Sequence, residues 1–341
     1  MCGIAGVHRL TDRPFADIDR FAAELLAGIE SRGRDATGFV AFNDVGDTQM
    51  QKASCSAFYF NQHRGTIRPE TRTLLLHTRL ATQGKPAFPE NNHPVEAGGI
   101  YCVHNGHVSN DAELFKASGR TRVGQVDSEV IPAVVASGGW PNALKSLQEL
   151  DGDFAVALAS PKHPKELVLA RGNFSPLVYV QTDHLLVWAS TAEAIRNAWK
   201  VLGSPPANGR FRHMLEGDAL VINGGEVTRA TFEPKARPLP SWAITKKTPK
   251  VYVPKTSYAS REIVTRYEWD DKECDLVAVT ATVEDEDGDQ EDGWDIVKCD
   301  DCGDWIELDD LREVEMFGVT NLLCRACYEW AKVALGGFQG G

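Results

Sequence analysis

Hydrophobic residues recur along residues 2–232 in two patterns. Between Phe15 and Ile29 they return every three or four positions, as on one face of a helix. Elsewhere they form short runs of strand length: Thr37–Phe42, Thr73–His77, Ile100–His104, Phe154–Ala159, Leu167–Ala170, Leu177–Val180, Leu185–Ala189, Ala219–Ile222 and Glu226–Ala230. Further helices are expected at 111–117, 127–137, 140–149 and 191–199. Many strands with two groups of helices predict an α+β fold in which helices cover stacked sheets.

The pattern changes after residue 232. Residues 233–260 are rich in Pro, Lys and Ser, and residues 283–295 carry many acids but no Lys or Arg. Such segments are typical of extended or solvated chain. We therefore expect a domain at 2–232, a linker at 233–293 and a small module at 294–335.

Composition excludes several classes of protein. The net charge of −12 argues against a general nucleic-acid binder, because phosphate binding needs a basic face. No hydrophobic run has membrane-spanning length, so no membrane partner is expected. The N-terminal segment does not resemble a signal peptide, which predicts a cytoplasmic protein. In a reducing compartment the eight cysteines are expected to be thiols or metal ligands.

Cys2 is the first candidate for chemistry. A small second residue allows removal of Met1, which would leave Cys2 with a free α-amino group that titrates near neutral pH. A thiol beside such an amine is a nucleophile with its base on the same residue. The alternative is an ordinary second residue, and the position alone favours that alternative.

Five short motifs follow Cys2 and change this balance. They are Arg32–Gly38, His77–Gly84, Asn92–Pro94, His104–Gly106 and Asp127–Glu129. In this order the sequence resembles the class II glutamine amidotransferases, whose nucleophile is N-terminal, and most closely the glutaminase domain of glucosamine-6-phosphate synthase. The resemblance covers residues 2–232. It implies a four-layer αββα sandwich of the Ntn-hydrolase type.

The resemblance also implies a role for each motif. Cys2 would attack glutamine, with its α-amine as the base, and the Asn105 amide and the Gly106 N–H would form the oxyanion hole. Arg79 would bind the substrate α-carboxylate and Asp127 the α-ammonium. The supporting residues would be Thr82 at the substrate and Arg32 in a positioning role, with His77, His93 and His104 structural.

Each motif also has an ordinary structural reading. Arg79 could form a surface salt bridge, Asn105-Gly106 could be a turn, and Asp127 could cap a helix. Two residues depart from the family, which often has an aromatic residue at Leu80 and, in its glucosamine-type members, a histidine at Gln83. These departures affect the subfamily and leave the hydrolysis step in place.

The residues after 232 indicate whether this chain could itself contain the domain that receives the ammonia. About 110 residues follow residue 232, which is too few for a typical acceptor domain. We therefore expect a separate ammonia-accepting enzyme as partner, or a free-standing glutaminase. Two alternatives stay open: an amide hydrolase acting on another acyl substrate, and a catalytically silent interaction protein.

Two C-x-x-C pairs lie near the C-terminus. Cys299, Cys302, Cys324 and Cys327 have the spacing of a closed tetrahedral zinc site, and the second pair opens a helix-like stretch, as in treble-clef fingers. A structural Zn²⁺ would stabilise so small a module, while glutamine hydrolysis needs no cofactor. Trp305, Tyr328 and Trp330 could anchor a protein partner or form the module's own core.

Overall fold

The computed structural model describes residues 2–203 and 211–235 in full. Beyond them it describes the backbone of six short strands. These strands are β14 (Arg266–Asp270), β15 (Asp275–Val279), β16 (Ile296–Lys298), β17 (Trp305–Glu307), β18 (Leu311–Met316) and β19 (Val319–Cys324). The chain divides into two compact units, and the fully described residues belong to the first. Each unit is described by itself.

A seven-stranded antiparallel sheet forms one half of the first unit, in the order β11-β9-β10-β1-β4-β2-β3. Its strands are β1 (Gly3–Arg9), β2 (Ala36–Asn43), β3 (Thr48–Ala53), β4 (Thr71–Arg79), β9 (Val178–Gln181), β10 (Leu185–Ala189) and β11 (Phe211–His213). The N-terminal strand β1 lies in the middle, where Ala5 pairs with Leu76 of β4 and Ala189 of β10. The residue that precedes β1 therefore sits on a rigid element.

A six-stranded antiparallel sheet forms the other half, in the order β13-β12-β8-β7-β6-β5. Its strands are β5 (Val95–Ala97), β6 (Ile100–Val108), β7 (Gly152–Ser160), β8 (His163–Arg171), β12 (Asp218–Asn223) and β13 (Glu226–Thr231). Gly224 and Gly225 connect the last two strands with φ of 58° and 100°. Two positive φ values suit the right-handed twist of a hairpin, and β12 pairs with β13 directly across this turn.

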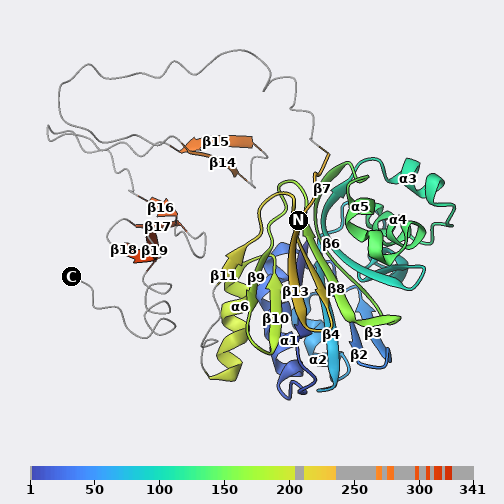
Figure 1. Ribbon diagram of the computed structural model, residues 1–341, viewed down its shortest axis with the longest axis horizontal. Coiled ribbons are helices and arrows are strands. Elements are labelled where there is room, and N and C mark those ends of the chain that lie inside the picture. Colours follow the sequence, from blue (N-terminus) through green and yellow to red (C-terminus); the bar gives the residue numbers. More distant parts are fainter. Residues whose placement is uncertain are drawn as a thin grey trace, which may run out of the picture. The chain divides into compact units, whose positions relative to one another are not determined.

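Helices cover the outer face of each sheet (Figure 1). The hydrophobic core of the seven-stranded sheet includes α1 (Ile18–Ile29), α2 (Ala57–His63) and α6 (Ala192–Trp199). The core of the six-stranded sheet includes α3 (Asp111–Ser118), α4 (Val130–Gly138) and α5 (Ala143–Leu147). A third core lies between the sheets and contains Ile4, Leu75, Val103 and Ala155. The predicted αββα layering is thus confirmed for the fully described residues.

Several elements differ from the hydrophobic pattern. No helix was expected at α2 and no strand at β3, whose sequence TQMQKA is largely polar. The helix expected at 127–137 begins as the 3-10 turn η3 (Asp127–Glu129) before α4. The range expected as a linker, 233–293, contains the antiparallel pair β14 and β15. Within the predicted zinc module, β16 pairs with β17 and β18 with β19.

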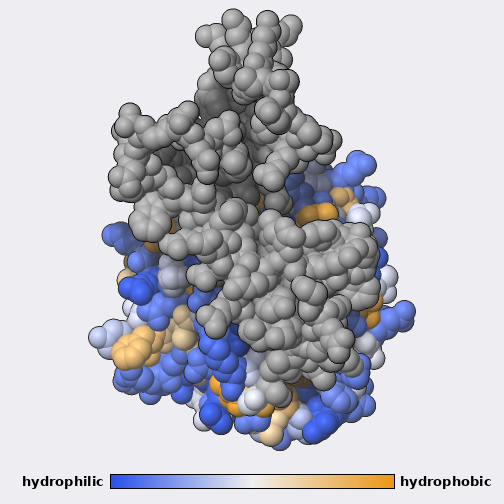
Figure 2. Space-filling view, turned by 90° about the vertical axis from the view of Figure 1, so that its left-hand side faces the viewer, coloured by the Kyte–Doolittle hydropathy of each residue, from blue (hydrophilic) through white to orange (hydrophobic). Residues whose placement is uncertain are grey.

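The predicted zinc ligands lie mostly outside the described residues. This holds for Cys299, Cys302 and Cys327, while Cys324 is the last residue of β19 and is described by its backbone alone. The metal site therefore stays a prediction. Among the described residues, no helix is both long and hydrophobic enough to cross a membrane. The coloured surface in Figure 2 is mostly hydrophilic, with small hydrophobic patches.

Candidate active site

Cys2 lies directly before β1, at the end of the layer between the two sheets. Ile4, two residues on, belongs to the core between the sheets, and alternate residues of a strand face the same side. The start of β1 is held by Ser190, whose hydroxyl accepts a hydrogen bond from the Ile4 N–H at 3.0 Å. The thiol is thus presented at one end of the inter-sheet layer.

The Cys2 thiol is half-buried and close to the loop that follows β4. Its Sγ lies 3.7 Å from the carbonyl oxygen of Leu80. Burial raises the pKa of the thiol, although the Leu80 hydrogen bond and the charge of Arg79 act to lower it. Because the net shift is upward, the thiol is protonated at neutral pH. A nucleophile in this setting needs a base.

The Arg-Gly-Arg-Asp motif clamps Cys2 to the end of β4. Arg32 donates from Nε to the Cys2 carbonyl at 3.0 Å. A Cβ on Gly33 would lie 2.3 Å from the Arg79 carbonyl carbon, so only glycine fits there. The Asp35 carboxylate accepts the Ala81 N–H at 2.7 Å. The motif therefore fixes the backbone of Arg79 and Ala81 relative to Cys2.

Arg79 is the last residue of β4 and is buried. Its guanidinium donates to Asn92 Oδ1 at 2.9 Å, to the Gly84 carbonyl at 2.9 Å and to the Gln83 carbonyl. These three acceptors are neutral oxygens, so no directly bonded carboxylate among the described residues cancels the charge. The expected alternative, a surface salt bridge, does not describe this side chain. A buried guanidinium whose direct hydrogen bonds go to neutral oxygens suits an anionic ligand.

Asn105 and Gly106 lie inside strand β6, paired with Ala155 and Phe154 of β7. The alternative reading of these residues as a turn is therefore wrong. The Asn105 side chain is fully buried, and neither its Oδ1 nor its Nδ2 has a hydrogen-bond partner in the described part of the chain. Gly106 has a φ of 142°, and a Cβ there would lie 1.9 Å from the Asp153 carbonyl oxygen.

Asp127 opens the turn η3 beside this strand and is 6% exposed. Its Oδ2 accepts the Val108 N–H at 2.7 Å and lies 3.2 Å from His107 Nδ1. Val126 occupies the N-cap position of η3, and Asp127 is an acid in its first turn, which is compatible with a role in the site as well. Asp127 is near enough to both Cys2 and Arg79 to raise the pKa of each through its charge. Thr82, the remaining predicted residue, is exposed on the loop after β4.

Three buried histidines connect the motifs behind the site. His77 contacts the His104 carbonyl through Nε2 at 3.0 Å and stacks on His93 with ring centroids 4.0 Å apart. His104 Nδ1 lies 2.8 Å from the Ser128 hydroxyl. Burial lowers the pKa of all three, that of His77 to about 3. Neutral, tightly packed rings agree with the structural role expected for them.

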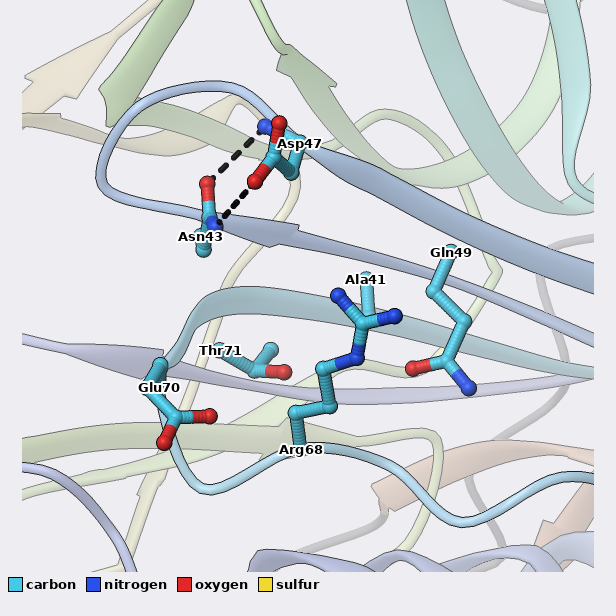
Figure 3. A pocket seen from close by; sticks show the side chains of 7 residues that line it. All are labelled: Ala41, Asn43, Asp47, Gln49, Arg68, Glu70 and Thr71. Atoms are coloured by element: carbon cyan, nitrogen blue, oxygen red, sulfur yellow. Dashed lines mark hydrogen bonds between the residues drawn. The ribbon is translucent and has the colours of Figure 1, made fainter.

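The pocket shown in Figure 3 is a different feature. Arg68 and Glu70 line it, together with Ala41, Asn43, Asp47, Gln49 and Thr71. Asn43 pairs with Thr71 at one end of strands β2 and β4, whereas Ala36 pairs with Arg79 at the other end. The pocket therefore lies at the end of these strands opposite the site around Cys2.

Comparison with known proteins identifies the domain that carries this geometry. The family described as "Glutamine amidotransferase domain" matches residues 77–197, a range that includes Arg79, Asn105 and Asp127. The chain contains a class II glutamine amidotransferase domain. The amidotransferase domain is 29% identical over 191 residues to 7-cyano-7-deazaguanine synthase of Sulfolobus acidocaldarius, covering 54% of this chain and 41% of that protein.

A second relative has a different printed activity. Glutamine–fructose-6-phosphate aminotransferase of Gluconobacter oxydans is 34% identical over 181 residues, or 50% of this chain and 29% of that protein. The chain thus spans 41% and 29% of the lengths of these two relatives. Among solved structures, glutamine phosphoribosylpyrophosphate amidotransferase from B. subtilis matches 68% of this chain and 49% of its own, with a TM-score of 0.55 and 20% identity. That structure shares the fold of the amidotransferase domain.

Reasoning from the sequence missed several residues that build the site. Asp35 and Asn92 contact Arg79, and His107 and Ser128 contact Asp127. Asp35 and Asn92 belong to motifs that were recognised, but neither was given a role. Their partners are distant in sequence, so only the motifs themselves could have pointed to them.

Proposed function

We propose that the amidotransferase domain hydrolyses the side-chain amide of glutamine through a thioester on Cys2 and supplies the ammonia to an acceptor. One observation carries this proposal. The charges of Arg79 and Asp127 both act on the Cys2 thiol, so these three groups lie close together, and Asn105 on strand β6 carries a buried amide with no partner among the described residues. This set matches a carboxamide substrate with a free amino-acid head group.

The reaction follows from these groups. The Cys2 sulfur attacks the carbonyl carbon of the glutamine side chain, and its proton passes to the base. Negative charge develops on the carbonyl oxygen, where the Asn105 amide and the Gly106 N–H would donate hydrogen bonds. The carbon–nitrogen bond then breaks, and the proton returns to the leaving nitrogen as ammonia departs. Water hydrolyses the thioester, which releases glutamate and restores the thiol.

The base in this proposal is the α-amine of Cys2, exposed by removal of Met1. The raised pKa of the thiol supports the need for one. The buried histidines are poor candidates, because their lowered pKa makes them weak proton acceptors and His77 is bonded to a carbonyl. An α-amine titrates near neutral pH, so it can accept the proton there.

Substrate recognition would use the two charged side chains. The guanidinium of Arg79 presents planar donors that suit the α-carboxylate of glutamine. Asp127 would hold the α-ammonium, because its Oδ2 is fixed by the Val108 N–H while Oδ1 has only a 3.4 Å contact with the Ser128 hydroxyl. Opposite charges at the two ends of the head group would orient the amide toward Cys2.

The acceptor of the ammonia is proposed to be a separate polypeptide. The two relatives compared above are named as a synthase and an aminotransferase, and more than half of each lies outside the region that this chain matches. The identity of the acceptor does not follow from the site itself.

The direct test measures ammonia and glutamate from glutamine with the full chain and two single variants. Cys2→Ala should reduce both products to background, and Cys55→Ala, which changes another partly buried thiol, should leave them unchanged. The electrophilic glutamine analogue 6-diazo-5-oxonorleucine should label Cys2, and mass spectrometry should find an N-terminus without Met1. Full activity in Cys2→Ala, or in a protein that keeps Met1, would refute the mechanism.

A structural zinc site is proposed as a second feature of the chain. The spacing of Cys299, Cys302, Cys324 and Cys327 supports it. Metal analysis of the purified chain should find about one zinc per molecule, lost in Cys299→Ser. Glutamine hydrolysis should survive this substitution, because no step at Cys2 uses a metal. A metal-free protein that retains four reactive C-terminal thiols would contradict the site.

A further inference from the structure

We infer that Asn92 is a positioning residue that orients the Arg79 guanidinium for the substrate carboxylate, and that Lys52 holds Asn92 in place. The inference rests on the proposed function, since it concerns the same carboxylate site. Neither residue has a role in the chemistry described above. Both are identified by their contacts: Asn92 binds Arg79, and Lys52 of strand β3 binds the backbone of the segment that carries Asn92.

The Asn92 side chain is fixed at both of its polar atoms. It is 1% exposed, its Oδ1 accepts from Arg79 Nη1 at 2.9 Å, and its Nδ2 donates to the Pro86 carbonyl at 2.7 Å. With both ends engaged, the amide cannot rotate without breaking a buried hydrogen bond. The remaining bonds of Arg79 go to Gly84 and Gln83, which lie on its own loop. Asn92 is thus the contact that ties the guanidinium to a second segment.

Lys52 anchors the backbone of this second segment. Its Nζ donates to the Asn92 carbonyl at 2.9 Å and to the Pro94 carbonyl at 3.2 Å, and burial lowers its pKa. The close approach of the Asn92–Pro94 backbone to strands β2 and β3 requires a glycine at position 38. A Cβ there would lie 2.2 Å from the His93 carbonyl oxygen and 3.0 Å from Lys52 Cγ. The last glycine of the Arg32–Gly38 motif therefore makes room for the contact between β3 and the Asn92 segment.

The chemical type of Asn92 matters as much as its position. An amide oxygen fixes the guanidinium without cancelling its charge, whereas a carboxylate at the same place would form an ion pair. Arg79 would then carry its counter-ion inside the protein, and the substrate carboxylate would have to compete with it. An asparagine here keeps the positive charge available for the ligand.

The test compares Asn92→Asp with Asn92→Ala in the full chain. Asn92→Asp has nearly the shape of the original residue but should raise the KM for glutamine roughly tenfold or more. Asn92→Ala should raise it less, and kcat should change little in either variant, because the contact acts on substrate binding. Lys52→Met should raise KM in the same direction. Lys52→Arg should restore it, since arginine can donate to both carbonyls.

A second substrate separates positioning from simple loss of structure. The α-methyl ester of glutamine lacks the carboxylate charge, so the wild-type protein should strongly prefer glutamine over it in kcat/KM for ammonia release. This preference should shrink in Asn92→Asp. A merely structural defect would lower both rates together and leave the preference unchanged. Lys116→Met, at an exposed lysine on α3, is the matched control for Lys52→Met.

The outcomes are distinct for the two proposals. If the wild-type chain shows no Cys2-dependent hydrolysis of glutamine, the proposed function fails. If it hydrolyses glutamine and Asn92→Asp keeps both the wild-type KM and the wild-type preference, this inference alone is refuted. A raised KM with a reduced preference in a variant that unfolds like the wild type supports it.

Discussion

The unpartnered amide of Asn105 predicts that one substitution lowers activity and raises stability. The residue is 0% exposed, and neither polar atom of its side chain has a partner among the described residues. A buried polar group left unsatisfied costs about 1–3 kcal/mol. Leucine has a similar shape and no polar atom. Asn105→Leu should therefore increase the free energy of unfolding by about 1–3 kcal/mol while lowering kcat by roughly 10²–10³, the typical effect of losing one oxyanion donor.

The chain offers a matched control for this prediction. Asn92 is equally buried, but both ends of its amide are hydrogen-bonded. Asn92→Leu removes the same polar group, leaves the Arg79 Nη1 N–H without its acceptor, and takes one of two hydrogen bonds from the Pro86 carbonyl, to which Ser54 still donates. It should decrease the free energy of unfolding by about 1–3 kcal/mol or more. The sign of the stability change should differ between two identical substitutions.

The assay is urea unfolding of each variant, analysed for a change in midpoint at constant slope, together with steady-state ammonia release. Two results would refute the reasoning. If Asn105→Leu is destabilised as much as Asn92→Leu, the Asn105 amide is satisfied in the folded protein, for instance by buried water. If it is more stable but fully active, the amide does not act on the oxyanion.

Three further predictions concern other residues. Burial lowers the pKa of His8 from 6.5 to about 3, so the unfolded chain binds a proton that the folded chain excludes, and stability falls as pH drops from 6.5 toward 3. The free energy of unfolding of the wild type should therefore fall between pH 7 and pH 5, and His8→Gln should make this fall smaller by about 2 kcal/mol in urea unfolding. The same pH dependence in the variant and the wild type would contradict this prediction. Arg79→Lys should raise the KM for glutamine more than it lowers kcat, because an ammonium cannot reproduce a two-pronged contact; an equal effect on both in steady-state kinetics would exclude that role. Gly106→Ala should lower the thermal midpoint and abolish hydrolysis, because its Cβ would meet the Asp153 carbonyl oxygen at 1.9 Å, and a stable, active variant would show that β6 can shift.

The hydrophobic pattern was sufficient to predict those helices and strands whose apolar residues are buried in the core. Helix α1 buries the apolar stripe that its spacing predicts, and the apolar runs of β4 and β7 lie in the sheets. Strand β3 escaped prediction because its residues are polar and partly exposed, and its pairing with β2 supplies the hydrogen bonds that define it. The pairing of such a strand depends on the neighbouring strand, so the sequence of the strand itself carries no hydrophobic pattern that would predict it.

For the candidate site, the sequence pointed to individual residues but not to the contacts that surround them. Asn105-Gly106 has the local signature of a turn, and the sequence alone left that reading open. The structure resolves it, since the long-range pairing of β6 with β7 holds both residues in a strand. Arg79 likewise lacks a local sign of its partners. Its hydrogen bonds reach residues four, five and thirteen positions away on an irregular loop, for which no periodicity exists.

Two buried asparagines show which part of the site lies beyond a sequence pattern. Asn92 and Asn105 both stand in short motifs, both are at most 1% exposed, and both lie beside histidines. Only their hydrogen bonds distinguish them, because one amide is fully engaged and the other has no partner in the described residues. A satisfied amide stabilises the segment around it, whereas an unsatisfied one is a cost that folding alone does not explain. That contrast supports a positioning role for Asn92 and a role toward the substrate for Asn105, and it depends on contacts between segments far apart in the chain.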